Sequence, residues 1–401
     1  MSAVLAPGLA APSQRAAHLP ADLVALLCVA AAGLLVAFPI ASFALSTFLL
    51  INLPTATTRT TRLMLACTAA LAFSMMMGAR PLDPDAPNDI DVYYEVYREL
   101  AEGRIEALFT FGGGLEVALP LLCGLWALVL PPLTPNGLMF CSALTGSLLM
   151  VAWVEVAFYR DRRWQDPALM GVCVLLLNLY FATQLTRQFI ALIVLLFAFS
   201  ATTRPRQAFW VVVATTFHLT AIPFFGLYLL ARRGPKGWLA IIALAITFRV
   251  FFWQLVEALD IVPAAVAEKL AYYVDNTQEF TDADIASLRM IALLGVISLA
   301  SLVACRFRPD PMTRAWLAVP WVAAIVHFLL LPIPLASLRA TLMVHSVAPG
   351  LIAYRMLWRR GGPLLLAVLN ILFAYKIVTF VAAQQSGNLL SAAEMLAGFL
   401  S

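Results

Sequence analysis

The stretch that decides the fold runs from Leu177 to Ala231 and reads LNLYFATQLTRQFIALIVLLFAFSATTRPRQAFWVVVATTFHLTAIPFFGLYLLA. It is largely apolar, yet it contains Arg187 beside Gln188 and, further on, His218. Ionisable side chains are costly at membrane depth, and those that occur there usually mark functional sites. The alternative is that Arg187 snorkels to a lipid headgroup and His218 caps a helix. The stretch predicts membrane helices and makes Arg187 and His218 the first candidate site residues.

Composition points to the same class of protein. Of the 401 residues, 62% are hydrophobic and 12% are charged, whereas soluble domains average about 45–50% apolar residues. Many apolar runs are long enough for a hydrocarbon core about 30 Å thick, and none alternates with the period of two that barrel strands show. We therefore expect an all-α, polytopic membrane protein with about 10–12 transmembrane or re-entrant helices.

Charge and cysteine usage exclude two other classes. The net charge of +4 comes from Lys and Arg in short loops, where they set membrane topology and do not indicate a nucleic-acid partner. The six cysteines lie in or beside apolar runs and form no C-x-x-C pair. We interpret them as packing residues, with no disulfide framework and no metal site.

The chain reads as one membrane domain with two tails. Residues 1–20 are predicted to be a disordered tail, residues 21–383 an integral membrane domain, and residues 384–401 a C-terminal tail. In the first apolar run, Pro39 either kinks one long helix or divides two short ones, which leaves the side of the N-terminus open. Arg59 and Arg62 predict a cytoplasmic loop before the next span.

The first large outer segment covers residues 80–114. Asp89, Tyr93 and Tyr97 are spaced four residues apart and share one face of a predicted helix. A carboxylate and two phenols on one face suit a sugar or a hydroxyl acceptor; the alternative is an amphipathic helix lying on the bilayer. The glycines at positions 112–114 lack the flanking signature of a phosphate loop, and we interpret them as a bend.

The basic loops then fix the topology. The strongly basic loop 159–163 should be cytoplasmic, so residues 115–131 are predicted to be a short dipping or interfacial element rather than a span. Residues 207–231 are bounded by basic clusters at both ends. This pattern favours a hairpin of two short arms turning near His218; a single span would violate the charge rule.

A second outer segment is predicted at residues 257–289. It is acidic and carries Tyr272 and Tyr273 in a helical stretch, which suits either a sugar platform or a solvated loop helix. Arg339 begins a later outer helix. The same topology places Arg187 and Gln188 at the outer surface.

The order of these motifs resembles the EpsG family of bacterial exopolysaccharide polymerases, which are Wzy-like. The matching residues are Asp89, Tyr93 and Tyr97, then Arg187-Gln188-Phe189-Ile190-Ala191, then Phe217-His218, and less specifically Arg339. Where the family has a glycine before its acid, this chain has Pro87-Asn88. Both Asp89 and Asp91 therefore stay candidates for the acidic role.

The resemblance implies a GT-C-like polymerase/ligase architecture in the bacterial inner membrane, with the active site facing the periplasm. It implies transfer of a growing glycan from undecaprenyl diphosphate to the non-reducing-end hydroxyl of a new repeat unit, without cofactor, metal or nucleotide. Arginine suits a departing diphosphate, so Arg187 and Arg339 are the expected cations. Asp89 or His218 is the expected base. The expected substrate-binding residues are Tyr93, Tyr97, Gln188, Asp91, Tyr272 and Tyr273.

The expected partners are the undecaprenyl-diphosphate-linked oligosaccharide, membrane lipid and a chain-length regulator of the Wzz type. Two other classes stay open at this point. An O-antigen ligase or another polyprenyl-linked glycosyltransferase needs the same arginine and base. A flippase of lipid-linked sugars also needs cavity cations, but such transporters often show two related halves, and no repeat is visible here.

Overall fold

A computed structural model describes residues 20–53, 58–82, 89–159, 166–177, 185–257, 311–330, 366–378 and 397–400, with isolated positions at 182, 292, 295–296, 298–299, 302–303, 307, 350–351 and 354. Within these ranges the chain is helical and forms no sheet. The named helices are α1 (Ala21–Ala37), α2 (Pro39–Asn52), α3 (Arg59–Gly78), α4 (Asp89–Ala101), α5 (Ala107–Thr110), η1 (Phe111–Gly114), α6 (Ala118–Val129), α7 (Pro135–Val154), η2 (Glu155–Tyr159), α8 (Ala168–Leu175), α10 (Thr186–Ser200), α11 (Arg204–Phe217), α12 (Ala221–Ala231), α13 (Pro235–Glu257) and α16 (Pro311–Leu330).

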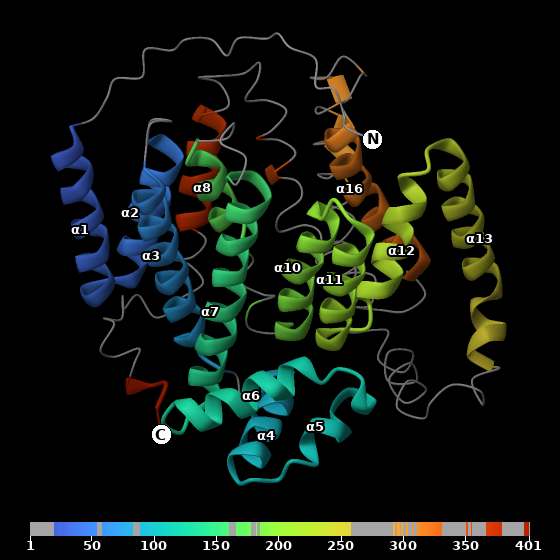
Figure 1. Cartoon of the computed structure of the whole chain (residues 1–401), viewed down its shortest axis with the longest axis horizontal. Coiled ribbons are helices and arrows are strands. Elements are labelled where there is room, and N and C mark those ends of the chain that lie inside the picture. Colours follow the sequence, from blue (N-terminus) through green and yellow to red (C-terminus); the bar gives the residue numbers. More distant parts are fainter. Residues whose placement is uncertain are drawn as a thin grey trace.

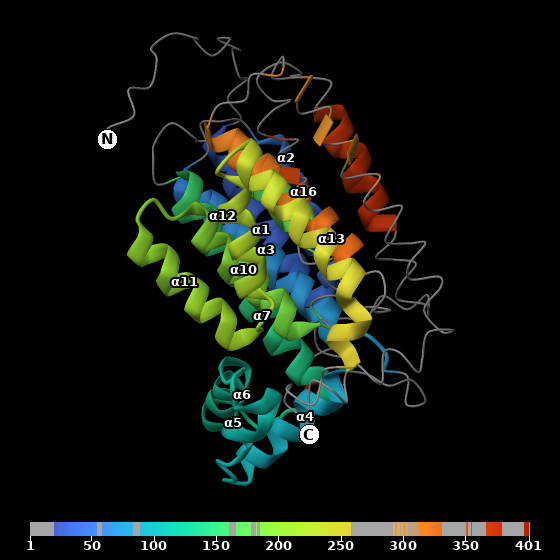
Figure 2. The same ribbon diagram turned by 90° about the vertical axis from the view of Figure 1, so that its right-hand side faces the viewer.

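The helices form a bundle with a cover at one end. The long helices run side by side, and α4, α5 and α6 lie across the lower end of the bundle in Figure 1. After a 90° turn, the same three helices still lie below the bundle (Figure 2). The predicted all-α, polytopic membrane architecture is confirmed, and the cover helices include the residues expected to form the first outer segment.

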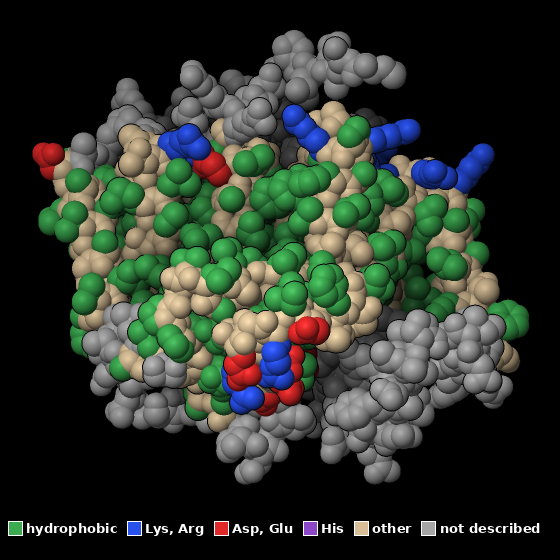
Figure 3. Space-filling view, turned by 60° about the horizontal axis from the view of Figure 1, so that its bottom comes forward, with side chains coloured by type: hydrophobic (Ala, Val, Ile, Leu, Met, Phe, Trp, Pro, Cys, Tyr) green, Lys and Arg blue, Asp and Glu red, His purple; other side chains and the backbone are tan. Residues whose placement is uncertain are grey.

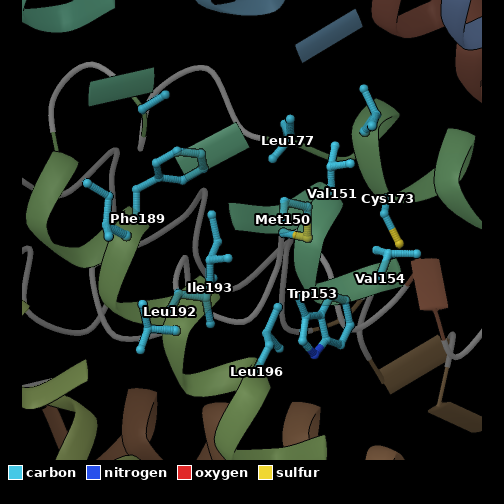
Figure 4. Close-up of a cluster of buried hydrophobic side chains, with 14 of the residues drawn as sticks. Met150, Val151, Trp153, Val154, Cys173, Leu177, Phe189, Leu192, Ile193 and Leu196 are labelled. Atoms are coloured by element: carbon cyan, nitrogen blue, oxygen red, sulfur yellow. The ribbon is translucent and has the colours of Figure 1, made fainter. Parts of the chain in front are cut away.

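The centre of the bundle is packed where α7, α8 and α10 meet. Figure 4 shows Met150 and Trp153 of α7 facing Phe189 and Ile193 of α10, with Cys173 of α8 beside them. All five side chains are at most 2% exposed. Continuous apolar sequence suits a helix that is buried all round, and α10 is buried over nearly its whole length.

Two helices, Arg59–Gly78 and Pro135–Tyr159, are long and apolar enough to cross a membrane, and several shorter apolar helices accompany them. Both long helices start at a threonine N-cap. Thr58 accepts a hydrogen bond from the backbone of Thr61, and Thr134 accepts one from Gly137. Such caps satisfy backbone donors that a helix start leaves open.

Pro39 divides two short helices, which decides between the two predicted alternatives. α1 ends at Ala37 and α2 begins at Pro39, where the missing N–H costs no helical hydrogen bond. The Ser42 hydroxyl donates to the Ala31 carbonyl oxygen at 2.7 Å, which ties the two arms together.

The predicted turn near His218 is also present. α11 ends at Phe217 and α12 begins at Ala221, so His218 lies in the break between two short helices. Residues 118–129 form the 12-residue helix α6, which lies across the bundle end instead of along it (Figure 1).

Hydrogen bonds show which helix ends lie together away from the cover. Arg59 and Arg62, at the start of α3, bind Glu155 at the end of α7 at 2.7 and 2.9 Å. The Trp153 indole N–H donates to the Ser200 hydroxyl at 2.9 Å, which brings the end of α10 to the same place. Exposed basic residues lie at the start of α11, which follows α10, and just after the end of α12. They are Arg204, Arg206, Arg232 and Arg233.

Charge is therefore divided between the two ends of the bundle. Figure 3 shows Lys and Arg side chains along the upper edge and a mixed acidic and basic group on the near face, where the cover lies. That group belongs to α4 and the turn after it, where Arg104 pairs with Glu99 and Glu102. Green apolar surface separates the two charged zones.

The described cysteines are free thiols, and all except Cys67 are buried. They are Cys28, Cys67, Cys123, Cys141 and Cys173.

Near the C-terminus, Phe399 is 2% exposed and stacks on Phe140 with ring centroids 4.9 Å apart. The tail at residues 1–19, positions 258–289 of the second outer segment, and Cys305 lie outside the described residues.

Candidate functional site

Five polar side chains meet where the cover touches the bundle. Tyr93 comes from α4, Glu116 from the turn before α6, Arg187 and Gln188 from the first turn of α10, and His218 from the break between α11 and α12. Four separate parts of the chain thus converge on one place.

Glu116 lies at the centre of this group. One carboxylate oxygen, Oε2, pairs with the Arg187 guanidinium. The other, Oε1, lies 2.6 Å from His218 Nδ1 and accepts a hydrogen bond from the backbone N–H of Leu219 at 3.1 Å. The Glu116 side chain is 6% exposed, so these partners replace nearly all of its hydration.

The surroundings of Glu116 fix its charge. Burial alone would raise the pKa of this carboxyl group, but the hydrogen bond to His218 and the positive charge of Arg187 act against it and lower the pKa to about 2. Glu116 is therefore a carboxylate at any physiological pH. A carboxylate only accepts hydrogen bonds, and so weak a base is unsuited to removing a proton from a hydroxyl group.

Arg187 is enclosed by aromatic rings as well as by Glu116. Its guanidinium carbon lies 4.9 Å from the centre of the Phe111 ring and 5.4 Å from that of Tyr93. Its Nε donates to the Tyr93 hydroxyl at 3.3 Å. The arginine side chain keeps 14% of its surface exposed. The rings hold the guanidinium plane in place, and the side chain is not completely buried.

Gln188 binds the other face of His218. Its amide nitrogen Nε2 lies 2.7 Å from His218 Nε2. The amide oxygen of Gln188 is buried and has no hydrogen-bond partner within the part of the chain that the structure describes. The imidazole ring is thus held between a carboxylate and a carboxamide, with 15% of its side chain exposed.

The glycines at positions 112–114 bring Glu116 into this position. All three have positive φ, at 57°, 70° and 75°, which bends the chain back from α5 toward α6. Glycine adopts this conformation without strain. A Cβ added at Gly112 would lie 3.0 Å from Glu116 Cβ and 3.1 Å from its Oε2. The bend expected from the sequence is present, and it carries a site residue.

Replacing Gly112 with alanine should disturb the site in addition to straining the turn. Gly113→Ala is the matched control, because it has a similar φ of 70° but no atom within 4 Å of an added Cβ. We expect both variants to lose about 1–2 kcal/mol of stability from left-handed backbone strain. Only Gly112→Ala should lower the activity of the site, by about 10-fold or more through the displaced carboxylate. Equal activity in the two variants would contradict the role assigned to Gly112.

The structure separates the sequence-predicted residues of α4. Asp89 is half-buried on the face that carries Tyr93, and its charge acts on Arg187. Asp91 is exposed to the outside. Tyr97 is buried, and its hydroxyl accepts a hydrogen bond from the backbone N–H of Leu133 at 3.0 Å. Tyr97 therefore holds the cover together, away from Arg187.

Three expected site residues, Arg339, Tyr272 and Tyr273, lie outside the described residues.

Asp89 and Asp91 form an Asp-x-Asp sequence, a pattern that often binds metal and that the expectation of a metal-free site did not consider. On α4 the two side chains differ in direction, one half-buried and one exposed. Across the described ranges, no group of three potential ligands lies close enough to hold a metal ion.

Glu116 is the site residue that the sequence reasoning missed. It is an isolated acid in front of the apolar run that forms α6. The reasoning that singled out Arg187 and His218, that an ionisable residue in apolar sequence needs a reason, applies equally to Glu116. That signal was present in the sequence.

The profile of the EpsG family matches residues 63–391, which include every residue of this site. The chain belongs to the EpsG family. No curated protein and no solved structure matches it. Membership of this family identifies the protein as a membrane protein of polysaccharide biosynthesis, of the general class of polysaccharide polymerases.

Proposed function

We propose that this EpsG-family protein joins undecaprenyl-diphosphate-linked oligosaccharide repeat units into exopolysaccharide or O-antigen. The observation that carries the proposal is the group formed by Arg187, Glu116 and His218 at the covered end of the bundle. It combines a cation for a diphosphate leaving group with an imidazole for a hydroxyl proton.

The position of the site supports action at the periplasmic face of the bacterial inner membrane. Arg59 pairs with Glu155 at the end of α7, away from the cover. Arg204 begins α11 shortly after the end of α10, and Arg232 follows α12, whose Tyr228 hydroxyl reaches the Phe199 carbonyl oxygen of α10. Positively charged loops stay in the cytoplasm, so the cover and the site face the other side. Repeat units carried on a lipid are presented at that membrane surface.

Arg187 is the proposed binding group for the donor diphosphate. A guanidinium offers a planar fork of donors that matches phosphate oxygens. It lies in the first turn of α10, where the helix dipole adds positive potential. In the resting site Arg187 pairs with Glu116, and a diphosphate, with its greater charge, competes with that carboxylate for the guanidinium. Arg339 remains a proposed second cation.

His218 is the proposed base for the acceptor. The acceptor hydroxyl oxygen bonds to the anomeric carbon of the donor sugar, while the bond from that carbon to the diphosphate oxygen breaks. The electron pair of that bond leaves with undecaprenyl diphosphate, stabilised by Arg187. The hydroxyl proton passes to His218 Nε2 and then to water. The leaving group is already activated, so the step consumes no nucleotide.

Other predicted residues take supporting roles in this proposal. Tyr93 is buried beside Arg187 and its hydroxyl accepts a hydrogen bond from Arg187 Nε, so its proposed role at the substrate site is to hold Arg187 in position. Asp89 adds negative charge near Arg187. Tyr272 and Tyr273 are proposed for the sugar platform, and a chain-length regulator of the Wzz type is the proposed protein partner.

The test uses purified protein in nanodiscs with a synthetic undecaprenyl-diphosphate repeat unit as the only sugar source. We expect a ladder of products that differ by one repeat unit, formed without nucleotide sugar. His218→Gln should reduce the ladder by about 10²–10⁴-fold, the usual contribution of a general base. Arg104→Ala, on the cover but outside the site, is the control and should retain the ladder.

Other outcomes would identify a different activity. Transfer of single finished glycans to a lipid A acceptor, with no ladder, would indicate a ligase. Movement of the intact lipid across the bilayer, with no new glycosidic bond, would indicate a flippase. Either result would overturn the polymerase proposal.

A further inference from the structure

We propose that Glu116 is a positioning residue that holds His218 in one tautomer, with the proton on Nδ1 and the reactive lone pair on Nε2. This inference deepens the proposed function and rests on it for its catalytic meaning. Its structural part, the tautomer of His218, is tested separately below.

The first step follows from the contacts of Glu116 Oε1. This oxygen receives the backbone N–H of Leu219 at 3.1 Å and faces His218 Nδ1 at 2.6 Å. Glu116 is a carboxylate and has no proton to give, so the hydrogen bond to His218 must be donated by the imidazole. His218 therefore carries its proton on Nδ1.

The second step concerns the opposite ring nitrogen. In a neutral imidazole with the proton on Nδ1, Nε2 is an acceptor. The Gln188 amide nitrogen lies 2.7 Å from it and is a suitable donor. Both neighbours of the ring thus favour the same tautomer. Gln188 occupies Nε2 in the resting site, and an acceptor hydroxyl takes that place during reaction.

The third step links the two reacting groups. The same carboxylate binds Arg187 through Oε2 and His218 through Oε1, so the group that binds the donor and the group that activates the acceptor are held in a fixed relation. A diphosphate that binds Arg187 leaves the contact between Glu116 and His218 in place, because the two contacts use different carboxylate oxygens. Among the charged groups that the structure describes, Glu116 contacts the ring directly. Arg187 is bound to the same carboxylate, and the charge of Asp89 acts on Arg187.

Nitrogen-15 NMR of histidine-labelled protein in nanodiscs tests the tautomer. The chain has four histidines, and comparison with His218→Gln assigns the signal of interest. Spectra are recorded across roughly pH 6 to 9, the range that surrounds the charge change of an ordinary histidine. We expect the unprotonated nitrogen of wild-type His218 to couple to both ring carbon-bound hydrogens, which identifies it as Nε2.

Glu116→Gln is the decisive variant. The Arg187 guanidinium requires the amide oxygen of the new side chain, which turns its NH2 group toward His218 Nδ1. We expect the form with a bare Nδ1 to appear and kcat for polymer synthesis to fall by about 10²–10⁴-fold, with a smaller change in KM. Glu155→Gln, which removes the carboxylate paired with Arg62 at the other end of the bundle, should leave the His218 signal unchanged.

The outcomes separate this inference from the proposed function. A bare Nδ1 in the wild type, or an unchanged His218 signal in Glu116→Gln, would overturn the positioning role whatever the activity. If Glu116→Gln does not fold, the wild-type spectrum alone decides the tautomer. A bare Nε2 in a protein that makes no ladder would support the tautomer and overturn the polymerase.

Discussion

Replacing Arg187 with lysine should lower polymer synthesis by about 10²–10³-fold while the protein stays folded, because one preorganised transition-state donor contributes about that much. Lysine keeps the positive charge that Glu116 needs. It loses the planar fork that binds two phosphate oxygens at once. The measurement is the initial rate of ladder formation from the lipid-diphosphate repeat unit at saturating substrate.

Lysine is preferred to alanine for this test. Arg187→Ala would leave the Glu116 carboxylate buried and unpaired, which costs about 3–5 kcal/mol and confuses loss of folding with loss of function. Arg62→Lys is the matched control, since Arg62 is also buried and bound to a carboxylate, Glu155, at 2.9 Å. Full activity in Arg187→Lys would exclude a forked diphosphate contact.

The site residues that could be predicted from the sequence were those whose own ionisable side chain is costly in apolar sequence. Arg187 and His218 stand out in apolar sequence because ionisable groups are costly there. The helix break at His218 followed from basic clusters at both ends of residues 207–231, and the structure has that break between α11 and α12. Sequence alone indicated both positions and the fold class.

The contacts between these residues could not be predicted, because they depend on how distant segments pack. Tyr93 and Tyr97 share a face of α4, yet Tyr93 reaches Arg187 while Tyr97 binds the backbone of Leu133. Helical periodicity gives the face but not the partner. Glu116 shows the same limit, since its role depends on α10 and α11, which lie far along the chain.

The glycines at positions 112–114 show how a local signal acquires meaning from packing. Three consecutive glycines predict a bend in any fold. Only the return of the chain toward Arg187 and His218 shows that Glu116 is the residue this bend delivers. An isolated acid that follows a glycine bend and precedes an apolar run is therefore a candidate site residue in its own right.

Acidification should destabilise the wild-type protein more than Glu116→Gln. The folded pKa of Glu116 is about 2, below its ordinary value of 4.5, so its contribution to stability is present above pH 4.5 and is lost as pH falls toward 2. The full shift corresponds to on the order of 3 kcal/mol, of which about 2 kcal/mol should disappear between pH 6 and pH 3.

The measurement is the difference in unfolding free energy between the two proteins as a function of pH, in which the titration of all other carboxylates cancels. Near neutral pH the wild type should be the more stable, and the gap should narrow steadily below about pH 4.5. A gap that stays constant down to pH 3 would mean that Glu116 is not a buried carboxylate in the folded protein. In that case the charge of Glu116 could not be used to infer that His218 carries its proton on Nδ1. The tautomer would have to be explained by the contact with Gln188 alone.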